Sequence, residues 1–198
     1  REPNDGYSIV YNLISRVLGT NEYNDYIGLE FIKNNGSNPD LDIIELDNNG
    51  THVILRGTSI VALTKGFGVY LEEYCNTTYD FEIYQVQIPD VMPLPKYQRL
   101  VRSVPMMYYQ NVCTVSYTMA FWDWNLWEKN LDWAAMQGIT HPLAFNGQEY
   151  VFAKMFHYFG FTTADLETFF SGPGFYAWQR MGNIQGWGGP LKESEIIN

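Results

Sequence analysis

One cluster of side chains that could bind a ligand lies in residues 109–117, which read Tyr-Gln-Asn-Val-Cys-Thr-Val-Ser-Tyr. The stretch places Asn111, Cys113 and Tyr117 at the end of an expected strand, where amide and phenol groups can bind the hydroxyls of a ligand such as a sugar. The same groups often bond to nearby backbone, so loop stabilisation is the favoured reading for Asn111 and Tyr117. Cys113 lacks a nearby histidine, which argues against a thiol nucleophile.

A second cluster reads Phe-Asn-Gly-Gln-Glu at residues 145–149 and follows an apolar run. A carboxylate at the end of a strand can act as an acid, a base or a nucleophile, which makes Glu149, with Gln148 beside it, a candidate. Alternatively, Glu149 begins the next helix, where its charge complements the positive N-terminal end. The sequence leaves both readings open.

Glycine and aromatic residues dominate the stretch 171–178, which ends at Trp178. An indole in such a loop can be presented to a sugar ring. Phe175 and Trp187 lie close in sequence, so a packed aromatic loop is an equally good explanation of the pattern.

The histidines and cysteines do not predict a metal site or a cofactor. His52, His141 and His157 are scattered, and Cys75 and Cys113 are far apart and outside any CxxC spacing. The two cysteines can pair with each other, pair outside the chain or stay free.

The charge of the chain limits its partners. A formal net charge of -10 argues against nucleic-acid binding, because neutralising phosphates needs an excess of lysine and arginine. The same negative charge disfavours binding a sulfated polymer along the polymer's whole length. An acidic compartment suits such a chain, because protonation of carboxylates relieves self-repulsion there. No apolar run approaches the roughly 18 to 20 residues that span a bilayer.

Three Asn-x-Ser/Thr sequons begin at Asn35, Asn49 and Asn76, and the first two lie in Asn/Gly-rich stretches typical of exposed turns. The chain begins with Arg1, which fits removal of a signal peptide. These features favour a glycoprotein that passes through the secretory pathway.

Residues 1–103 are expected to form a small α/β domain that ends in a proline-rich linker. The apolar spacing predicts helices at 7–18 and 59–74 and strands at 26–32, 41–46, 52–56 and 81–88. Prolines at 89, 93, 95 and 105 interrupt regular structure and mark the boundary.

Residues 104–198 are expected to begin a parallel α/β architecture. The pattern predicts a strand in 107–113, a helix at 123–137, a strand at 139–145 and a helix at 150–158.

The stretch from Tyr108 to Tyr117, followed by Phe-Trp-Asp-Trp at 121–124, resembles glycoside hydrolase family 89, the alpha-N-acetylglucosaminidases. The resemblance continues collinearly through Gly-Gln-Glu at 147–149 and Ala177-Trp178 to Arg-Met-Gly-Asn at 180–183. It implies a small N-terminal domain followed by a (β/α)8 TIM barrel and a helical domain. It also implies removal of terminal alpha-linked N-acetylglucosamine with retention of configuration, on heparan sulfate in the lysosomes of animals.

Carried over by position, the resemblance assigns Asn111, Cys113, Tyr117 and Trp178 to the substrate-binding pocket, with Gln148 and Glu149 at its possible edge. Phe145-Asn146 stands where relatives often have a small or apolar pair, which alters that edge. The family's two catalytic carboxylates lie on later barrel strands, so no catalytic residue is expected in this chain.

The chain supplies only the first βα units of a barrel that takes about 250 residues. We therefore expect the carboxylates to lie on a complementary C-terminal chain produced by proteolytic processing, or on a segment missing from this chain. The expected substrate is a glycan. The sequence leaves open whether the protein forms a homo-oligomer. The alternative is a non-catalytic carbohydrate-binding or structural protein derived from such an enzyme.

Overall fold

The computed structural model describes residues 3–82, 86–144 and 146–196. They form two compact units. The first contains the described part of 1–108 together with 124–141, and the second contains 109–123 and the described part of 142–198. Residues 124–141, which the sequence-based division placed with the barrel portion, group with the N-terminal unit.

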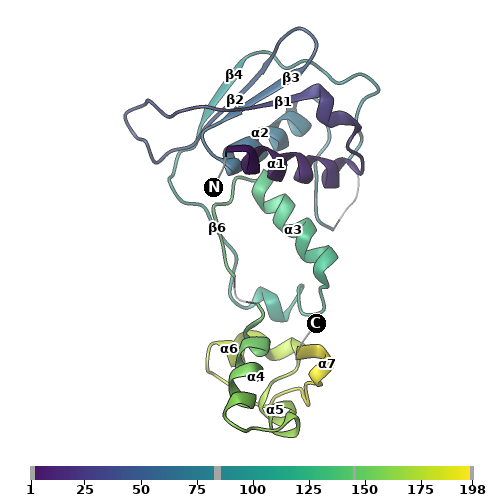
Figure 1. The fold of residues 1–198 in the computed structure, drawn as a ribbon, viewed down its shortest axis with the longest axis vertical. Coiled ribbons are helices and arrows are strands. Elements are labelled where there is room, and N and C mark those ends of the chain that lie inside the picture. The colour runs from purple at the N-terminus through teal and green to yellow at the C-terminus, as the bar shows by residue number, and fades with distance from the viewer. Residues whose placement is uncertain (1–2, 83–85, 145, 197–198) are drawn as a thin grey trace. The chain divides into compact units, whose positions relative to one another are not determined.

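The first unit is a four-stranded sheet covered on one face by helices α1 (Pro3–Leu18) and α2 (Ile60–Glu73) (Figure 1). The strands are β1 (Ile27–Phe31), β2 (Ile43–Asn48), β3 (Val53–Gly57) and β4 (Gln98–Val101), in the order β1-β3-β2-β4. Strand β3 runs parallel to β1 and antiparallel to β2, and β2 runs antiparallel to β4. A 3-10 helix, η1 (Glu22–Tyr26), leads into β1.

Side chains alternate across this sheet, as strand geometry requires. Ile44, Leu46 and Leu55 point into the core beneath the two helices. On the other face, Arg56 of β3 bonds to Glu30 of β1 at 2.5 Å and to Asp47 of β2 at 2.9 Å. The sheet therefore has one apolar face and one charged face.

The predicted helices and first three strands are confirmed to within a few residues. Gly19 follows α1 with φ +70, the left-handed conformation expected of a glycine that ends a helix. Helix α2 begins after Ser59, whose hydroxyl accepts a hydrogen bond from the Ala62 N–H at 3.0 Å.

The fourth strand lies elsewhere than predicted. Of the expected strand at 81–88, residues 83–85 are outside the described residues, and residues 81–82 and 86–88 form no strand. The fourth strand is β4, within the stretch expected to be an irregular linker. Its partner is β2, and Pro95 and Pro105 lie outside the paired residues, where proline removes no ladder hydrogen bond.

Helix α3 (Trp124–Met136) packs against α2 in the first unit. A Cβ on Gly68 would lie 2.8 Å from the Met136 carbonyl oxygen, so only glycine permits this approach of α2. The Thr64 hydroxyl donates a hydrogen bond to the Ala135 carbonyl at 3.0 Å. Arg16 donates two hydrogen bonds to the Asp132 carboxylate, from Nε at 2.7 Å and from Nη2 at 2.6 Å.

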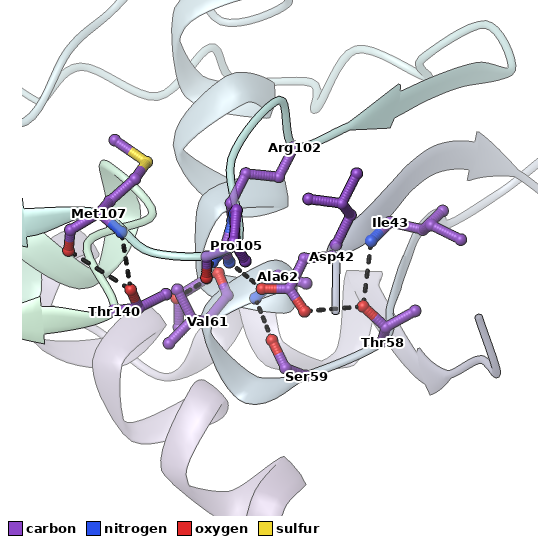
Figure 2. Close-up of polar contacts among 12 residues, drawn as sticks. Asp42, Ile43, Thr58, Ser59, Val61, Ala62, Arg102, Pro105, Met107 and Thr140 are labelled. Atoms are coloured by element: carbon purple, nitrogen blue, oxygen red, sulfur yellow. Dashed lines mark hydrogen bonds and ion pairs between the residues drawn. The ribbon is translucent and has the colours of Figure 1, made fainter. Parts of the chain in front are cut away.

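A polar network holds the chain where it leaves β4. Arg102 forms an ion pair with Asp42, and the side chains of the pair are 9% and 16% exposed. Thr58 donates to Asp42 at 2.8 Å and accepts from the Ile43 N–H at 3.0 Å (Figure 2). We call Asp42, Thr58 and Arg102 the exit network.

Strands β5 (Tyr108–Tyr109) and β6 (His141–Pro142) pair with each other. Met107 accepts from the His141 N–H at 3.0 Å, and Tyr109 accepts from the Leu143 N–H at 2.6 Å, so the two strands run in the same direction. The Thr140 hydroxyl also bonds to Met107 (Figure 2).

The order β5, α3, β6, α4 confirms the predicted alternation of strand and helix. Both strands are shorter than expected, and β6 is exposed rather than buried. Residue 145, the end of the second predicted strand, lies outside the described residues.

In its described residues the second unit contains four helices: α4 (Gln148–Tyr158), α5 (Thr163–Phe169), α6 (Tyr176–Arg180) and α7 (Glu193–Ile196). Two 3-10 helices, η2 (Thr114–Ser116) and η3 (Pro173–Phe175), precede α3 and α6 in the chain. The small core beneath these helices contains Leu166, Phe170 and Leu191. Helix α5 begins with a capping box between Thr162 and Asp165.

Candidate functional site

The turn that follows β5 carries three of the predicted binding residues. The side chain of Asn111 accepts the Cys113 N–H at 2.8 Å, and the Cys113 carbonyl accepts the Ser116 N–H at 2.9 Å. Asn111 therefore stabilises the turn, as the local reading of the sequence favours. Cys113 is half-buried and precedes η2, and the placement of this residue in a strand was wrong.

Tyr117 and Trp178 come together although 61 positions separate them in the chain. Their ring centroids lie 5.6 Å apart at an interplanar angle of 82°. This edge-to-face arrangement is one that aromatic pairs prefer. Tyr117 is 65% exposed, so the pair forms an open aromatic corner, and we use that name for it below.

The Trp178 side of the aromatic corner is part of a tightly packed loop. Phe175 lies 6.3 Å from Trp178 and 6.1 Å from Trp187 between ring centroids. A Cβ on Gly172 would lie 2.1 Å from the Gly188 carbonyl oxygen, so two backbone segments meet there at a distance that only glycine allows. The structure thus groups Phe175, Trp178 and Trp187 as the packed-loop reading expects, and presentation of the Trp178 indole to a sugar ring stays a prediction.

Glu149 is buried and bound to arginine. Its two carboxylate oxygens accept from Arg180 Nε at 2.9 Å and Nη2 at 2.7 Å, and the paired side chains are 8% and 5% exposed. Arg180 also donates to the Asn146 amide oxygen at 2.9 Å. Glu149 lies in the first turn of α4 and Arg180 in the last turn of α6, where each charge complements the helix dipole.

This geometry bears directly on the two readings of Glu149. A bidentate arginine occupies both carboxylate oxygens, so the group is not poised to transfer a proton. Gln148, the first residue of α4, is half-buried. A role for Gln148 and Glu149 at the pocket edge stays a prediction.

Tyr176 is kept neutral by its surroundings. Burial raises the pKa of its phenol to about 12, with a further contribution from the Glu149 and Glu195 carboxylates. The Arg180 guanidinium lies over the Tyr176 ring, 4.8 Å from its centroid. Tyr176 therefore serves as a flat support for Arg180 rather than as an acid or base.

Sequence reasoning assigned no role to three residues that hold the aromatic corner. The Ser116 hydroxyl accepts the Ala177 N–H at 2.8 Å. The Gln179 side chain binds the Ser171 N–H and donates to the Phe169 carbonyl at 3.1 Å. Arg180 is the third. Two polar residues, Gln179 and Arg180, directly follow Trp178 and were the only local signal for these roles, whereas Ser116 lies 61 positions from its partner Ala177.

The predicted glycosylation residues lie in the other unit. Asn35, Asn49 and Asn76 are all exposed, and Asn76 has a φ of +51 just after the end of α2. Cys75 and Cys113 are both free thiols, and burial raises the pKa of Cys75.

Among residues 3–82, 86–144 and 146–196, no three histidine, cysteine or acidic side chains are grouped closely enough to hold a metal ion. No helix in the described part of the chain combines the length and apolar character needed to cross a membrane.

Comparison with known proteins places both parts of the chain in one family. Residues 8–95 match the N-terminal domain of alpha-N-acetylglucosaminidase, and residues 107–198 match its tim-barrel domain. Human alpha-N-acetylglucosaminidase is 37% identical over 186 residues, which is 92% of this chain and 25% of the human protein.

Solved structures of a family 89 glycoside hydrolase from Clostridium perfringens match 98% of this chain and 22% of their own. A variant in complex with its substrate GlcNAc-alpha-1,4-galactose has a TM-score of 0.86 at 33% identity. A complex with PUGNAc has a TM-score of 0.85 at 34% identity.

The chain thus spans about a quarter of the length of these relatives. Its mixed α/β fold is a small N-terminal unit followed by the first βα units of a TIM barrel. The chain belongs to the alpha-N-acetylglucosaminidase family, glycoside hydrolase family 89, and corresponds to its N-terminal portion.

Proposed function

We propose that this chain is part of a retaining exo-glycosidase that removes terminal alpha-linked N-acetylglucosamine from glycans such as heparan sulfate. The observation that carries the proposal is the match of nearly the whole chain, at 33% identity, to an enzyme in complex with a GlcNAc-alpha-1,4-galactose substrate. The human relative is itself an alpha-N-acetylglucosaminidase.

In this proposal the chain provides one wall of the sugar pocket. The aromatic corner offers a flat indole face for the apolar side of a sugar ring and the Tyr117 hydroxyl for its polar groups. Asn111 and Cys113, in the turn that leads to Tyr117, complete the proposed wall. An exo-acting enzyme contacts only the end of a polymer, which reconciles a net charge of -10 with an anionic substrate.

The catalytic carboxylates come from outside this chain. A retaining glycosidase needs two of them about 5 to 5.5 Å apart, and Glu149 is engaged by Arg180. We infer that a complementary C-terminal polypeptide, either a separate processed chain or a continuation of this one, carries both. Native mass measurement should find the two portions together, and a stable monodisperse particle of 22.9 kDa would contradict this association.

A lysosomal or secreted location belongs to the same proposal. The exposed positions of all three sequon asparagines support it, because glycosylation requires surface access. Digestion of the natural protein with an N-glycosidase should lower its mass. An unchanged mass would argue against the glycoprotein assignment.

Hydrolysis of a chromogenic alpha-N-acetylglucosaminide tests the function. The chain together with its completing portion should release the chromophore, and the chain alone should not. If the complete protein binds N-acetylglucosamine without hydrolysing the substrate, the non-catalytic carbohydrate-binding alternative is the correct one.

A further inference from the structure

Helix α6, which carries Trp178, is too short to fix its own position. It has five residues, whereas an isolated helix shorter than about 12–15 residues is marginal in water. The direction of the Trp178 side chain must therefore be set by tertiary contacts on either side of it.

The first contact lies just before Trp178. The Ala177 N–H is one of the N-terminal amides of α6 that have no partner within the helix. It donates to the Ser116 hydroxyl at 2.8 Å, and Ser116 and Ala177 are 6% and 0% exposed. Ser116 immediately precedes Tyr117. A single buried bond thus joins the neighbours of the two rings that form the aromatic corner.

The second contact lies two residues after Trp178. Arg180 is held by the two oxygens of Glu149, by Asn146 and by the face of Tyr176. Burying an ion pair contributes little net stability, because removing both charges from water costs about as much as their attraction returns. Its bidentate geometry does fix orientation, since two parallel bonds prevent the guanidinium from rotating.

Gln179 completes the restraint between these two contacts. Its amide binds the Ser171 N–H and the Phe169 carbonyl at the end of α5. Residues on both sides of Trp178 are therefore tied to separate parts of the second unit, while the indole meets Tyr117 at 5.6 Å.

We propose that Ser116 and Arg180 are positioning residues, which hold the Trp178 indole at the angle to Tyr117 that binding of the sugar requires. This rests on the proposed function, because it assigns the aromatic corner to the pocket for terminal N-acetylglucosamine. Both residues act through Trp178 and do not themselves touch the sugar.

A double-mutant cycle in the complete protein tests the proposal. Arg180→Lys keeps the positive charge but loses the two parallel hydrogen bonds that the guanidinium makes with Glu149. Ser116→Ala removes the hydroxyl that accepts the Ala177 N–H. Each should raise KM for the chromogenic alpha-N-acetylglucosaminide roughly three- to tenfold, with kcat changed less than about twofold. In a Trp178→Ala background, neither change should raise KM further, because the group they position is gone.

The matched control is Arg16→Lys, which makes the same change in the bidentate pair with Asp132 of the first unit. It should leave KM unaltered in both backgrounds. The proposal is overturned if the KM effects of Arg180→Lys and Trp178→Ala are additive, if Arg180→Lys leaves KM unchanged, or if the control behaves like Arg180→Lys.

Near-ultraviolet circular dichroism supplies a readout that does not depend on activity. The difference between the wild-type and Trp178→Ala spectra reports the packed Trp178 ring, and Arg180→Lys and Ser116→Ala should lose most of it. An inactive wild-type protein would remove the proposed function alone, whereas a difference spectrum retained in both variants would contradict the positioning role itself.

Discussion

At the scale of single residues, Trp178 is half-buried and contacts two other aromatic rings. Phe175 supports one side of its ring and Tyr117 meets it edge-on. Such a rigid indole loses little conformational entropy on binding a ligand, which is why aromatic side chains dominate many binding surfaces.

Trp178→Ala in the complete protein should weaken sugar binding by roughly 1 to 3 kcal/mol, the usual cost of losing an aromatic contact. KM for the chromogenic substrate and inhibition by N-acetylglucosamine would both report the loss. Unchanged KM and kcat would show that Trp178 serves only in packing.

Glu149 shows the limit of sequence reasoning at this scale. The sequence left open whether Glu149 begins a helix or acts as an acid, a base or a nucleophile. The answer depends on Arg180, 31 positions away, and no local pattern connects two residues at that distance. By contrast, the Thr162 and Asp165 capping box spans one helical turn and could be read directly from the sequence.

Glu149→Gln should lower the free energy of unfolding by about 3–5 kcal/mol, because it leaves the Arg180 charge buried without a counter-charge. We expect no shift in either limb of the pH profile of kcat, because Arg180 occupies both carboxylate oxygens of Glu149. Urea unfolding and the pH profile measure the two effects separately. A displaced limb would return Glu149 to a catalytic role.

At the scale of elements, β4 and the exit network explain why the proline-rich stretch was misread. Proline breaks regular structure where its missing N–H is needed, but Pro95 and Pro105 flank the paired residues and leave room for a short edge strand. The position of the chain after β4 also depends on Asp42 and Thr58, which lie far earlier in the sequence. The fold of the N-terminal unit was otherwise predictable, because its helices and strands have clear apolar periodicity.

Arg102→Ala should destabilise the first unit by about 3–5 kcal/mol, because Asp42 loses the partner of its half-buried charge. Arg99→Ala is the matched control: Arg99 pairs with Glu45 on the same strand pair but is 43% exposed, so its loss should cost no more than about 1 kcal/mol. Thermal unfolding of both variants decides the matter. Equal losses would mean that the exit network is no more than a surface ion pair.

At the scale of the whole molecule, two features favour acidic conditions. The net charge of -10 produces self-repulsion that diminishes toward the pI of about 4.6. Burial also raises the pKa of Asp132 above its ordinary value of 3.8, and the opposing bonds from Arg16 do not cancel the effect. A carboxyl with a raised pKa binds its proton more tightly in the folded state, so stability falls as pH rises from 3.8 through the raised value.

The unfolding temperature should therefore fall as pH rises from 3.8 through the raised pKa of Asp132, and Asp132→Asn should make this fall smaller. Below 3.8 the trend reverses, because Asp47 and Asp165 have lowered pKa values and their stabilisation is lost as they protonate. Scanning calorimetry across pH 3 to 8 would reveal both slopes. A steady rise in stability up to neutral pH would show that the Arg16 pairing outweighs the burial of Asp132.

The second unit exposes aromatic side chains that we expect the remaining elements of a complete barrel to cover. Phe121, Tyr158 and Phe159 are 83%, 85% and 68% exposed. The sequence predicted that the chain holds only the first βα units, but it could not show which side chains are left exposed, because that depends on how the short helices turn.

The most direct test of the whole account is the hydrolysis of a chromogenic alpha-N-acetylglucosaminide by this chain with and without the polypeptide that completes the barrel. We predict no hydrolysis by the chain alone, and hydrolysis with retained anomeric configuration once the two are combined. A complete protein that binds the sugar but never cleaves it would contradict the account.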